Sequence, residues 1–414
     1  ADAGRAIPMT DGGSPAVASV EGTVTSPRGF RAAGVPCGIK RRKLDLALVV
    51  SDAPAAAAGV FTQIKTRAPS VVINEHKLGS GRAQAVLVNS GNANACTGRQ
   101  GFRDADRMAA AAASALGIEE SLVLATSTGV IGRPLPIDRI VAALPTLVSE
   151  LGPNGMAAAR AIMTTDAFMK TAAARVRLTE GGITIGGIAK GAGMIHPEMA
   201  TTIAIVTTDA ALEPGVLRSA LRESVDVTFN CISVDGDTST SDSVFVLANA
   251  ASGLRPVGGG GEDYDAFVSG LTDVLGRLAQ MVVRDGEGAE CVIEVSVQGA
   301  ASDADARLVG KTVMTSVLVK TAFHGAELNW GRIAAAAGRS GAELDPDRLS
   351  IAIGEVEIVR DGVGVPEAYR RAEPLLTEPR VRVAIGLGLG EGAFTGWTND
   401  LGVNYVKLNS GYLT

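Results

Sequence analysis

The sequence predicts an α/β fold followed by a smaller α+β domain at the C-terminal end. Apolar stretches such as Leu44–Val50 and Ala85–Val88 have the composition of buried strands, and Ala-rich or amphipathic stretches after them have a helical period. From Val292 onward the pattern changes to strand, helix and hairpin. With 414 residues, the chain is long enough for two or three domains.

The expected elements follow one another along the chain. Residues 1–28 are polar and contain Gly, Pro and Ser, so we expect a loose N-terminal arm. A larger region covers residues 29–289, and the α+β domain covers residues 290–414. Besides the two strands above, the expected elements are Asp104–Leu116, Ile137–Leu151, Ala157–Met163, Pro214–Val227, Asp263–Val283, Val292–Val297, Asp303–Met314 and a hairpin within Leu349–Val359.

The composition argues against several classes of function. A formal net charge of -6 gives no electrostatic reason to bind nucleic acid or acidic lipid. No apolar run is expected to span a bilayer, and the first residues lack the apolar core of a signal peptide. The cysteines are scattered without a C-x-x-C pair, so we expect reduced thiols and a cytoplasmic protein; they are Cys37, Cys96, Cys231 and Cys291.

The strongest chemical signal lies between Lys190 and Asp209. A glycine-rich run and a proline lead to Ala200 and Thr201, and alternating residues follow, as in a half-buried strand. A threonine behind such a bent approach could attack its own preceding carbonyl. Scission would leave Thr201 with a free α-amine, which titrates at about 7.7–8.0 and can act as a base for the hydroxyl. Taken alone, the pattern is more typical of a turn before a core strand.

Other segments carry weaker signals. In Ser127-Thr128-Gly129, a hydroxyl and a backbone N–H after a strand could stabilise an oxyanion, although such turns are common. The stretch 89–94 could be a binding loop, but a structural turn is favoured. Asp235, Asp237 and Ser239 imitate the start of a calcium loop. Thr240 stands where that loop needs Gly, and no suitable Glu follows, so we expect no metal.

Two further patterns have a simpler explanation than chemistry. The run Gly386–Gly392 has the wrong spacing for a nucleotide-binding loop and no expected helix after it. Among the histidines, His196 lies close to Thr201 in sequence, but adjacency is a poor predictor of a catalytic triad. We expect surface or structural roles for His76, in a polar loop, and for His324, in a turn.

Several of these segments resemble one family. The string Lys190-Gly-x-Gly-Met-x-x-Pro-x-Met-Ala-Thr resembles the autocleavage and nucleophile segment of the ornithine acetyltransferases (glutamate N-acetyltransferases). The resemblance runs from about Gly29 to Thr414, and its motifs occur in family order. The other segments that carry it are residues 127–132, 164–166, 236–242, 284–288, 324–332 and 400–414.

The resemblance implies a self-cleaving enzyme with a sandwich-type core. Cleavage between Ala200 and Thr201 would give an α and a β chain, which the family assembles as an α2β2 heterotetramer. In the implied ping-pong reaction, Thr201 takes the acetyl group of N-acetylornithine and passes it to glutamate, with Thr128 and Gly129 as oxyanion donors. No cofactor is implied. The implied substrate-binding residues are Thr164, Lys190, Thr201, Glu287, Asn409 and Thr414, the last two in a tail that reaches the active site.

Three positions depart from the family pattern. Met169 replaces a usual Pro, Cys291 replaces a usual Lys, and Leu328 follows Glu327 where Asp-Pro is usual. Alternative functions also stay open: an N-terminal-nucleophile amidase or aminopeptidase that uses water, an acetyltransferase for a related amino acid in a specialised pathway, or a metabolite-binding protein with an inert Thr201. The sequence does not decide whether acetyl-CoA is also a donor.

Overall fold

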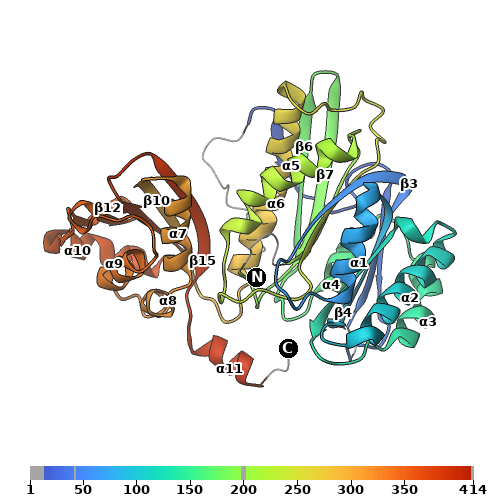
Figure 1. Ribbon diagram of the computed structural model, residues 1–414, viewed down its shortest axis with the longest axis horizontal. Helices are drawn as coiled ribbons and strands as arrows, with labels where there is room; N and C mark the ends of the chain where they lie inside the picture. The colour runs from blue at the N-terminus through green and yellow to red at the C-terminus, as the bar shows by residue number, and fades with distance from the viewer. Residues whose placement is uncertain (1–13, 42, 197–201, 412–414) are drawn as a thin grey trace.

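The structure, a computed structural model, describes residues 14–41, 43–196 and 202–411 (Figure 1). Within these ranges, the larger of two sheets has nine strands in the order β1-β6-β7-β8-β9-β3-β4-β5, and β2 also pairs with β3. Its strands are β1 Val17–Val20, β2 Phe30–Val35, β3 Leu46–Phe61, β4 Arg82–Asn92, β5 Val123–Val130, β6 Lys170–Leu178, β7 Gly181–Lys190, β8 Ile203–Thr208 and β9 Ser243–Ala248.

The long strand β3 divides this sheet into two leaves. Its first half pairs with β2 and β4, and its second half pairs with β9, with a register shift between Val50 and Ala55. An inner core lies between the leaves. Val49 and Val88 of one leaf belong to the same buried cluster as Ile205 and Phe245 of the other. The shifted register lets one strand serve both leaves, so the sheet folds over its own apolar face.

Helices cover the outer face of each leaf (Figure 1). On one side, α2 Gly98–Leu116 and α3 Ile137–Ser149 pack on β2 to β5. On the other, α5 Pro214–Asp226 and α6 Glu262–Arg284 pack on the second leaf. The helix α4 Gly155–Ile162 contributes to the inner core. This arrangement is a helix–sheet–sheet–helix sandwich, which confirms the predicted α/β class and sandwich-type core.

The second sheet begins at β10 and has the order β13-β12-β11-β14-β10-β15. In Figure 1 it forms a separate lobe beside α6, and the last helix runs back toward the larger lobe. Its apolar residues nevertheless belong to the same buried cluster as α5 and α6. The elements are β10 Val292–Ala300, α7 Asp303–Met314, α8 Val317–His324, α9 Trp330–Gly338, β11 Ser350–Ile353, β12 Val356–Arg360, β13 Val363–Gly364, α10 Pro366–Ala372, β14 Arg380–Gly386, β15 Gly392–Asn399 and α11 Val403–Gly411.

Some sequence expectations need correction. Val17–Val20 pairs with β6, so residues 14–28 are not all a loose arm; residues 1–13 lie outside the described ranges. Every residue of β8 is buried, rather than alternate ones, because β8 is a central strand covered on both faces. His76 lies in α1 Pro69–Lys77 and not in a loop. The strand β2 is not among the elements expected from the sequence.

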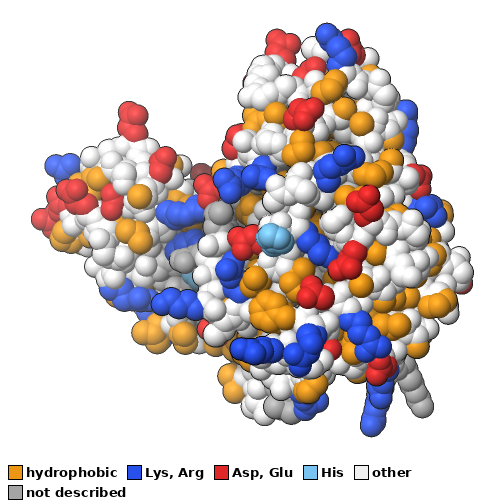
Figure 2. Space-filling model, turned by 45° about the vertical axis from the view of Figure 1, so that its right-hand side comes forward, with side chains coloured by type: hydrophobic (Ala, Val, Ile, Leu, Met, Phe, Trp, Pro, Cys, Tyr) orange, Lys and Arg blue, Asp and Glu red, His pale blue; other side chains and the backbone are white. Residues whose placement is uncertain are grey.

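The helix α6 is the one described helix that is long and apolar enough to cross a membrane. This criterion is one of length and composition alone, and the core helix of a folded protein also meets it. Indeed, 61% of its most apolar window is buried within the protein, and its buried face packs on the sheet. These contacts identify a core helix. On the face shown in Figure 2, acidic and basic side chains are interspersed.

Candidate active site

The first part of the site lies where two parallel strands end. Strands β4 and β5 pair so that Ser90 lies opposite Thr128 and Gly91 lies opposite Gly129. Carboxyl ends of parallel strands meet at one edge, where open α/β sheets commonly bind ligands. Gly129 has φ +129°, and a Cβ there would lie 2.4 Å from the backbone of Gly91. A side chain would therefore force β4 and β5 apart at this turn.

A buried hydrogen-bond chain holds the same turn from beneath. The Ser127 hydroxyl donates to Asn89 Oδ1 at 2.6 Å, and Asn89 Nδ2 donates to the carbonyl of Asn92 at 2.9 Å. Both side chains are buried. Residues 89–92 belong to β4, so most of the stretch 89–94 is the end of a strand and not the turn favoured from the sequence. Its side chains fix the residues that precede Thr128.

Lys190, the last residue of β7, reaches the turn from the neighbouring leaf. Its Nζ donates to Thr128 Oγ1 at 3.3 Å. Ala200 and Thr201 lie outside the described residues. The next residue, Thr202, donates from its hydroxyl to the carbonyl of Lys190 and lines a small cavity together with Thr128 and Lys190. Thr202, the first described residue after the predicted cleavage point, therefore lies beside the predicted oxyanion donor Thr128.

A buried ion-pair network supports the Thr164 loop. Lys170 Nζ lies 2.7 Å from Asp166 Oδ1 and 2.6 Å from Asp285 Oδ2, and its side chain is fully buried. Asp166 also accepts hydrogen bonds from the backbone N–H of Thr164 and of Gly191. Burial alone would raise the pKa of Asp166, but the Lys170 and Lys190 cations hold it well below its usual range. The network joins the loop to the end of α6 and to the start of the glycine-rich run.

The acidic segment that follows α5 forms another wall of the candidate site. Asp235 accepts hydrogen bonds from the backbone N–H of Met194 at 2.6 Å and of Ile195 at 2.9 Å. Asp242 is buried and accepts one from Ser239 N–H at 3.0 Å. Burial raises the pKa of both carboxyls, most strongly that of Asp242. These bonds hold the acidic segment against Met194 and Ile195 of the glycine-rich approach.

The tail closes the pocket from outside. Asn409, on α11, donates from Nδ2 to Glu287 Oε2 at 2.8 Å. Glu287 follows α6, and its backbone N–H donates to the carbonyl of Ala192 at 2.8 Å. A Cβ on Gly193 would lie 2.7 Å from the Glu287 carboxylate, so the glycine-rich run permits this close approach. Burial, together with Asp235 and Glu287, raises the pKa of Tyr405 on the same helix.

Polar contacts anchor the segment that leads into α11. Lys320 is buried, and its Nζ donates to Thr398 Oγ1 at 3.0 Å and to Asn399 Oδ1 at 2.8 Å. Burial lowers the pKa of Lys320 to about 7. Asp400 accepts hydrogen bonds from the N–H of Cys291 and lies 2.8 Å from His324 Nδ1. These contacts indicate a structural role for His324. They also hold Asp400 in place, so the start of the tail is fixed.

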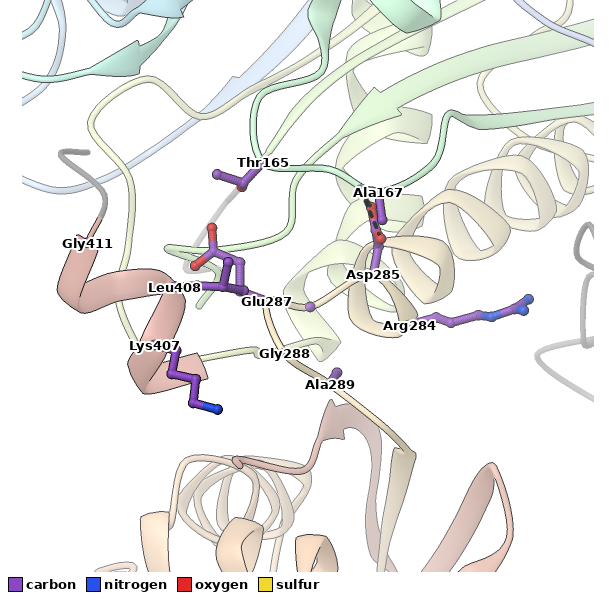
Figure 3. A pocket seen from close by; sticks show the side chains of 11 residues that line it. Thr165, Ala167, Arg284, Asp285, Glu287, Gly288, Ala289, Lys407, Leu408 and Gly411 are labelled. Atoms are coloured by element: carbon purple, nitrogen blue, oxygen red, sulfur yellow. Dashed lines mark hydrogen bonds between the residues drawn. The ribbon is translucent and has the colours of Figure 1, made fainter. Parts of the chain in front are cut away.

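These elements enclose one pocket of about 180 Å³. The structure brings together Thr128, Gly129, Thr164, Lys190, Glu287 and Asn409, while Ala200, Thr201 and Thr414 lie outside the described residues. Sequence reasoning missed Asp237 and Tyr405, which also line it. Their signal was present, because both lie within segments that carry the family resemblance. A neighbouring pocket of about 490 Å³ shares Thr165 and Glu287 with it (Figure 3).

The remaining sequence candidates have other surroundings. His196 Nδ1 lies 3.2 Å from Ser233 Oγ, and its carbonyl accepts a hydrogen bond from Thr238 Oγ1 at 2.7 Å. The departures from the family pattern are accommodated by packing. Met169 lies against the inner core, and Leu328 and Cys291 lie against the large cluster that both lobes share.

A sandwich of two sheet leaves between helices, with a small polar pocket at its strand ends, defines an α/β enzyme for small polar molecules. The chain belongs to the ArgJ family, whose model matches residues 31–414. This match confirms the family resemblance. The arginine biosynthesis bifunctional protein ArgJ of Symbiobacterium thermophilum is 49% identical over 397 residues, which cover 95% of this chain and 99% of that protein. ArgJ of Geobacter sulfurreducens is 46% identical over 390 residues, with 94% and 99% covered.

Two solved structures are also similar. The crystal structure of ArgJ from Bacillus halodurans matches with a TM-score of 0.43 and 41% identity, over 44% of this chain and 98% of that chain. Ornithine acetyltransferase from Mycobacterium tuberculosis, complexed with ornithine, matches with a TM-score of 0.42 and 44% identity, over 44% of this chain and 100% of that chain.

Proposed function

We propose that this chain transfers the acetyl group of N-acetylornithine to glutamate through an acetyl ester on Thr201. The main support is the meeting of Thr128, Lys190 and Thr202 at one small cavity, beside the larger pocket in which we place the substrate. Membership of the ArgJ family and the arginine-biosynthesis relatives support the same reaction.

Self-cleavage prepares the nucleophile in this proposal. The Thr201 hydroxyl adds to the carbonyl of Ala200, and the peptide C–N bond breaks to leave an ester and a free α-amine. Water then hydrolyses the ester, which gives a carboxylate at Ala200 and a free hydroxyl on Thr201. The new α-amine is the base for later turnovers, because it titrates near neutral pH.

In the transfer reaction, the α-amine takes the hydroxyl proton while Thr201 Oγ adds to the acetyl carbonyl. The Thr128 hydroxyl and the Gly129 N–H stabilise the resulting oxyanion. Since Lys190 donates to Thr128 Oγ1, the Thr128 proton is available for a further acceptor such as this oxyanion. The C–N bond breaks, the proton returns to the leaving nitrogen, and ornithine departs. The glutamate amine then attacks the ester and releases Thr201.

The pocket also offers groups suited to amino-acid substrates. An ammonium has three donors, so Lys190 can hold a carboxylate while it keeps its bond to Thr128. Glu287 suits an ammonium group, and Asn409 holds Glu287 in place. Thr164 and Thr414 complete the proposed binding set. No step requires a metal or an organic cofactor.

A second activity extends the proposal. The relatives are named bifunctional. Acetyl-CoA as a second donor would form the same ester on Thr201. Glutamate would then receive an acetyl group in an amino-acid N-acetyltransferase reaction. The division at residues 28 and 289, the α2β2 assembly and the cytoplasmic location stay predictions.

One experiment tests the transfer reaction against the amidase alternative. The enzyme is incubated with N-acetylornithine alone, and intact mass of the β chain is measured before and after glutamate is added. We expect one acetyl mass on the β chain, its loss on addition of glutamate, and parallel double-reciprocal plots. Free acetate released at one rate with or without glutamate would instead show an amidase, and a chain that stays uncut would favour the binding protein.

A further inference from the structure

The connection between β7 and β8 contains the predicted cleavage point and is held at both ends. At its start, the backbone N–H of Gly191 donates to Asp166 Oδ1 at 2.7 Å. At its end, the Thr202 hydroxyl donates to the carbonyl of Lys190. Lys190 and Ile203 lie opposite each other in the paired strands. The connection therefore begins and ends at one point of the sheet, so other contacts must set its path.

A second segment, residues 233–238, holds the described residues just before the cleavage point. One carboxylate oxygen of Asp235 accepts the backbone N–H of Met194 at 2.6 Å, and the other accepts that of Ile195 at 2.9 Å. Met194 has φ +56°, a left-handed conformation that is uncommon for residues other than glycine. Such a conformation persists where its surroundings fix it. The Asp235 carboxylate therefore holds the chain in a bent path at Met194.

The same segment also fixes the next two carbonyl groups. The Ile195 carbonyl accepts a hydrogen bond from the backbone N–H of Val234 at 2.7 Å, and the His196 carbonyl accepts one from the Thr238 hydroxyl at 2.7 Å. His196 is the last described residue before the cleavage point. Because a fixed carbonyl fixes the plane of its peptide group, the Thr238 bond sets the direction in which the chain leaves His196.

Self-cleavage and acetyl transfer make different demands on this backbone. In self-cleavage, the attacked carbonyl belongs to the chain itself, so the residues before Thr201 must bring the Ala200 carbonyl to the hydroxyl. In acetyl transfer, the attacked carbonyl arrives with the substrate, and Ala200 is no longer linked to Thr201. Contacts that hold the chain before residue 197 should therefore matter for the first reaction and little for the second. This inference rests on the proposed function.

We propose that Asp235 and Thr238 are positioning residues for self-cleavage, which hold residues 194–196 in the path that presents the Ala200 carbonyl to Thr201. In the step that they promote, the bond from Thr201 Oγ to the carbonyl carbon forms and the peptide C–N bond breaks. The hydroxyl proton passes to the leaving nitrogen. Both positioning residues follow the cleavage point in the sequence, so their bonds afterwards join the two fragments.

Thr238 separates this role from substrate binding. Asp235 lines the pocket in which we place the substrate, so its replacement could also change substrate binding. Thr238 lines neither that pocket nor the small cavity at Thr128 nor the pocket of Figure 3. Its hydroxyl contacts the chain before the cleavage point, so a change there should act on self-cleavage alone.

The test follows the uncut fraction over time during cell-free synthesis, by denaturing electrophoresis. Thr238→Val should slow self-cleavage about tenfold, because the His196 carbonyl loses its donor, and Thr238→Ser should restore the wild-type rate. Once cleavage is complete, Thr238→Val should transfer acetyl with the wild-type kcat. Asp235→Asn gives a second, independent measurement. It leaves one amide oxygen for two N–H groups and should also slow self-cleavage about tenfold or more.

Thr228→Val is the matched control. The Thr228 hydroxyl donates to the Ser224 carbonyl at 2.6 Å after α5, and Thr228 lines none of these three pockets. The substitution removes a bond of the same kind, so it should leave the rate of self-cleavage unchanged. Circular dichroism of the uncut chains compares their folding.

The outcomes separate the two proposals. Wild-type rates of self-cleavage in Thr238→Val and Asp235→Asn would overturn the positioning role. Equal slowing in Thr228→Val would overturn it too, because a general loss of stability would then explain the effect. The same holds for a kcat of cleaved Thr238→Val that falls as much as its self-cleavage. If the wild-type chain transfers acetyl without cutting itself, the proposed nucleophile itself is wrong.

Discussion

The pocket residues Lys190, Thr128 and Gly129 act in the proposed mechanism as hydrogen-bond donors. Lys190 donates to Thr128 Oγ1, and a hydroxyl that accepts one hydrogen bond keeps its own proton for another acceptor. Thr128 is also mostly buried, so a bond from its hydroxyl to an oxyanion would compete with little water. Gly129 lies so close to Gly91 that a Cβ would clash with its backbone, so the position of Gly129 beside Thr128 is fixed.

The Thr128 hydroxyl can be tested directly. Thr128→Ala should lower kcat by about 10²–10³, because one donor to the developing oxyanion is lost. Self-cleavage should slow as well, since it passes through a similar tetrahedral species. Thr128→Ser keeps the hydroxyl and should restore most of kcat. A correctly cleaved Thr128→Ala protein with unchanged kcat would remove Thr128 from the mechanism.

Site residues were predictable from the sequence where they belong to a local sequence motif. Thr128, Lys190 and Glu287 each stand in a Gly-rich or Thr-rich turn whose spacing shows in the sequence. The Asp166–Lys170–Asp285 network was not predictable, because Lys170 and Asp285 are 115 positions apart and meet only when β6 packs on α6. No local pattern records a contact of that range.

Between elements, Lys170 is the main electrostatic link from β6 to the end of α6. Lys170→Met would leave Asp166 and Asp285 buried together without their shared cation. We expect a loss of about 3–5 kcal/mol in the free energy of unfolding. Urea denaturation in the uncut Thr201→Ala background keeps unfolding within one chain. Arg177→Met is the control on the same strand, where Arg177 is exposed, and it should change stability by less than about 0.5 kcal/mol.

The pH dependence of this loss has a defined sign. In the wild type, the depressed pKa of Asp166 stabilises the fold above its unfolded pKa of about 3.9, and this contribution is lost as the pH falls toward the folded value. Burial already raises the pKa of Asp285 in the wild type. Without Lys170 the same effect should raise the pKa of Asp166, and acid should then relieve the repulsion between the two carboxylates. The deficit of Lys170→Met should therefore shrink between pH 7 and pH 5. An equal deficit at both values would contradict the electrostatic account.

Element types were more predictable than strand surroundings. The helix Asp303–Met314 has the predicted ends, and α3, α5 and α6 lie close to theirs, because their apolar periodicity is strong. The helix α2 ends at Leu116 as expected but begins at Gly98, well before the expected Asp104. The burial of β8 was not predicted, because Ile203 and Ile205 face the inner core while Ala204 and Val206 face α5 and α6. Larger and smaller side chains alternate along β8, and this pattern imitates the alternation of buried and exposed residues in a half-buried strand.

The helix α11 allows a second test at the level of whole helices and strands. It has no buried residue, yet Asn409 reaches Glu287, so α11 works as a cover and adds little to the core. Deleting residues 409–414 should weaken acceptor binding and raise the share of acetyl lost to water, with self-cleavage largely intact. Acetate and acetylglutamate are measured from the same acetyl-enzyme. An unchanged ratio of these products would show that the tail does not cover the site.

At the scale of the whole molecule, the proposed cleavage point falls inside one continuous sheet. Strands β1 to β7 precede residue 200, and β8 and β9 follow it. In space the two sets interlock, since β8 pairs with β7 and β9 pairs with β3. Both helices that cover the second leaf from outside, α5 and α6, also come from the later part of the chain. Cleavage at residue 200 would therefore cut a connection without separating a domain.

This topology predicts how the cleaved protein should behave. Denaturing electrophoresis should show two fragments of similar size, one beginning Thr-Thr-Ile-Ala, whereas Thr201→Ala should stay a single inactive chain. Under native conditions the fragments should elute together, because their separation would expose β7, β3 and the buried faces of α5 and α6. Urea should separate them only at concentrations that also unfold the sheet, as followed by circular dichroism. Fragments that part in native buffer, with the remaining sheet still folded, would contradict the interlocked arrangement, and a single band from active wild-type protein would exclude the N-terminal threonine mechanism.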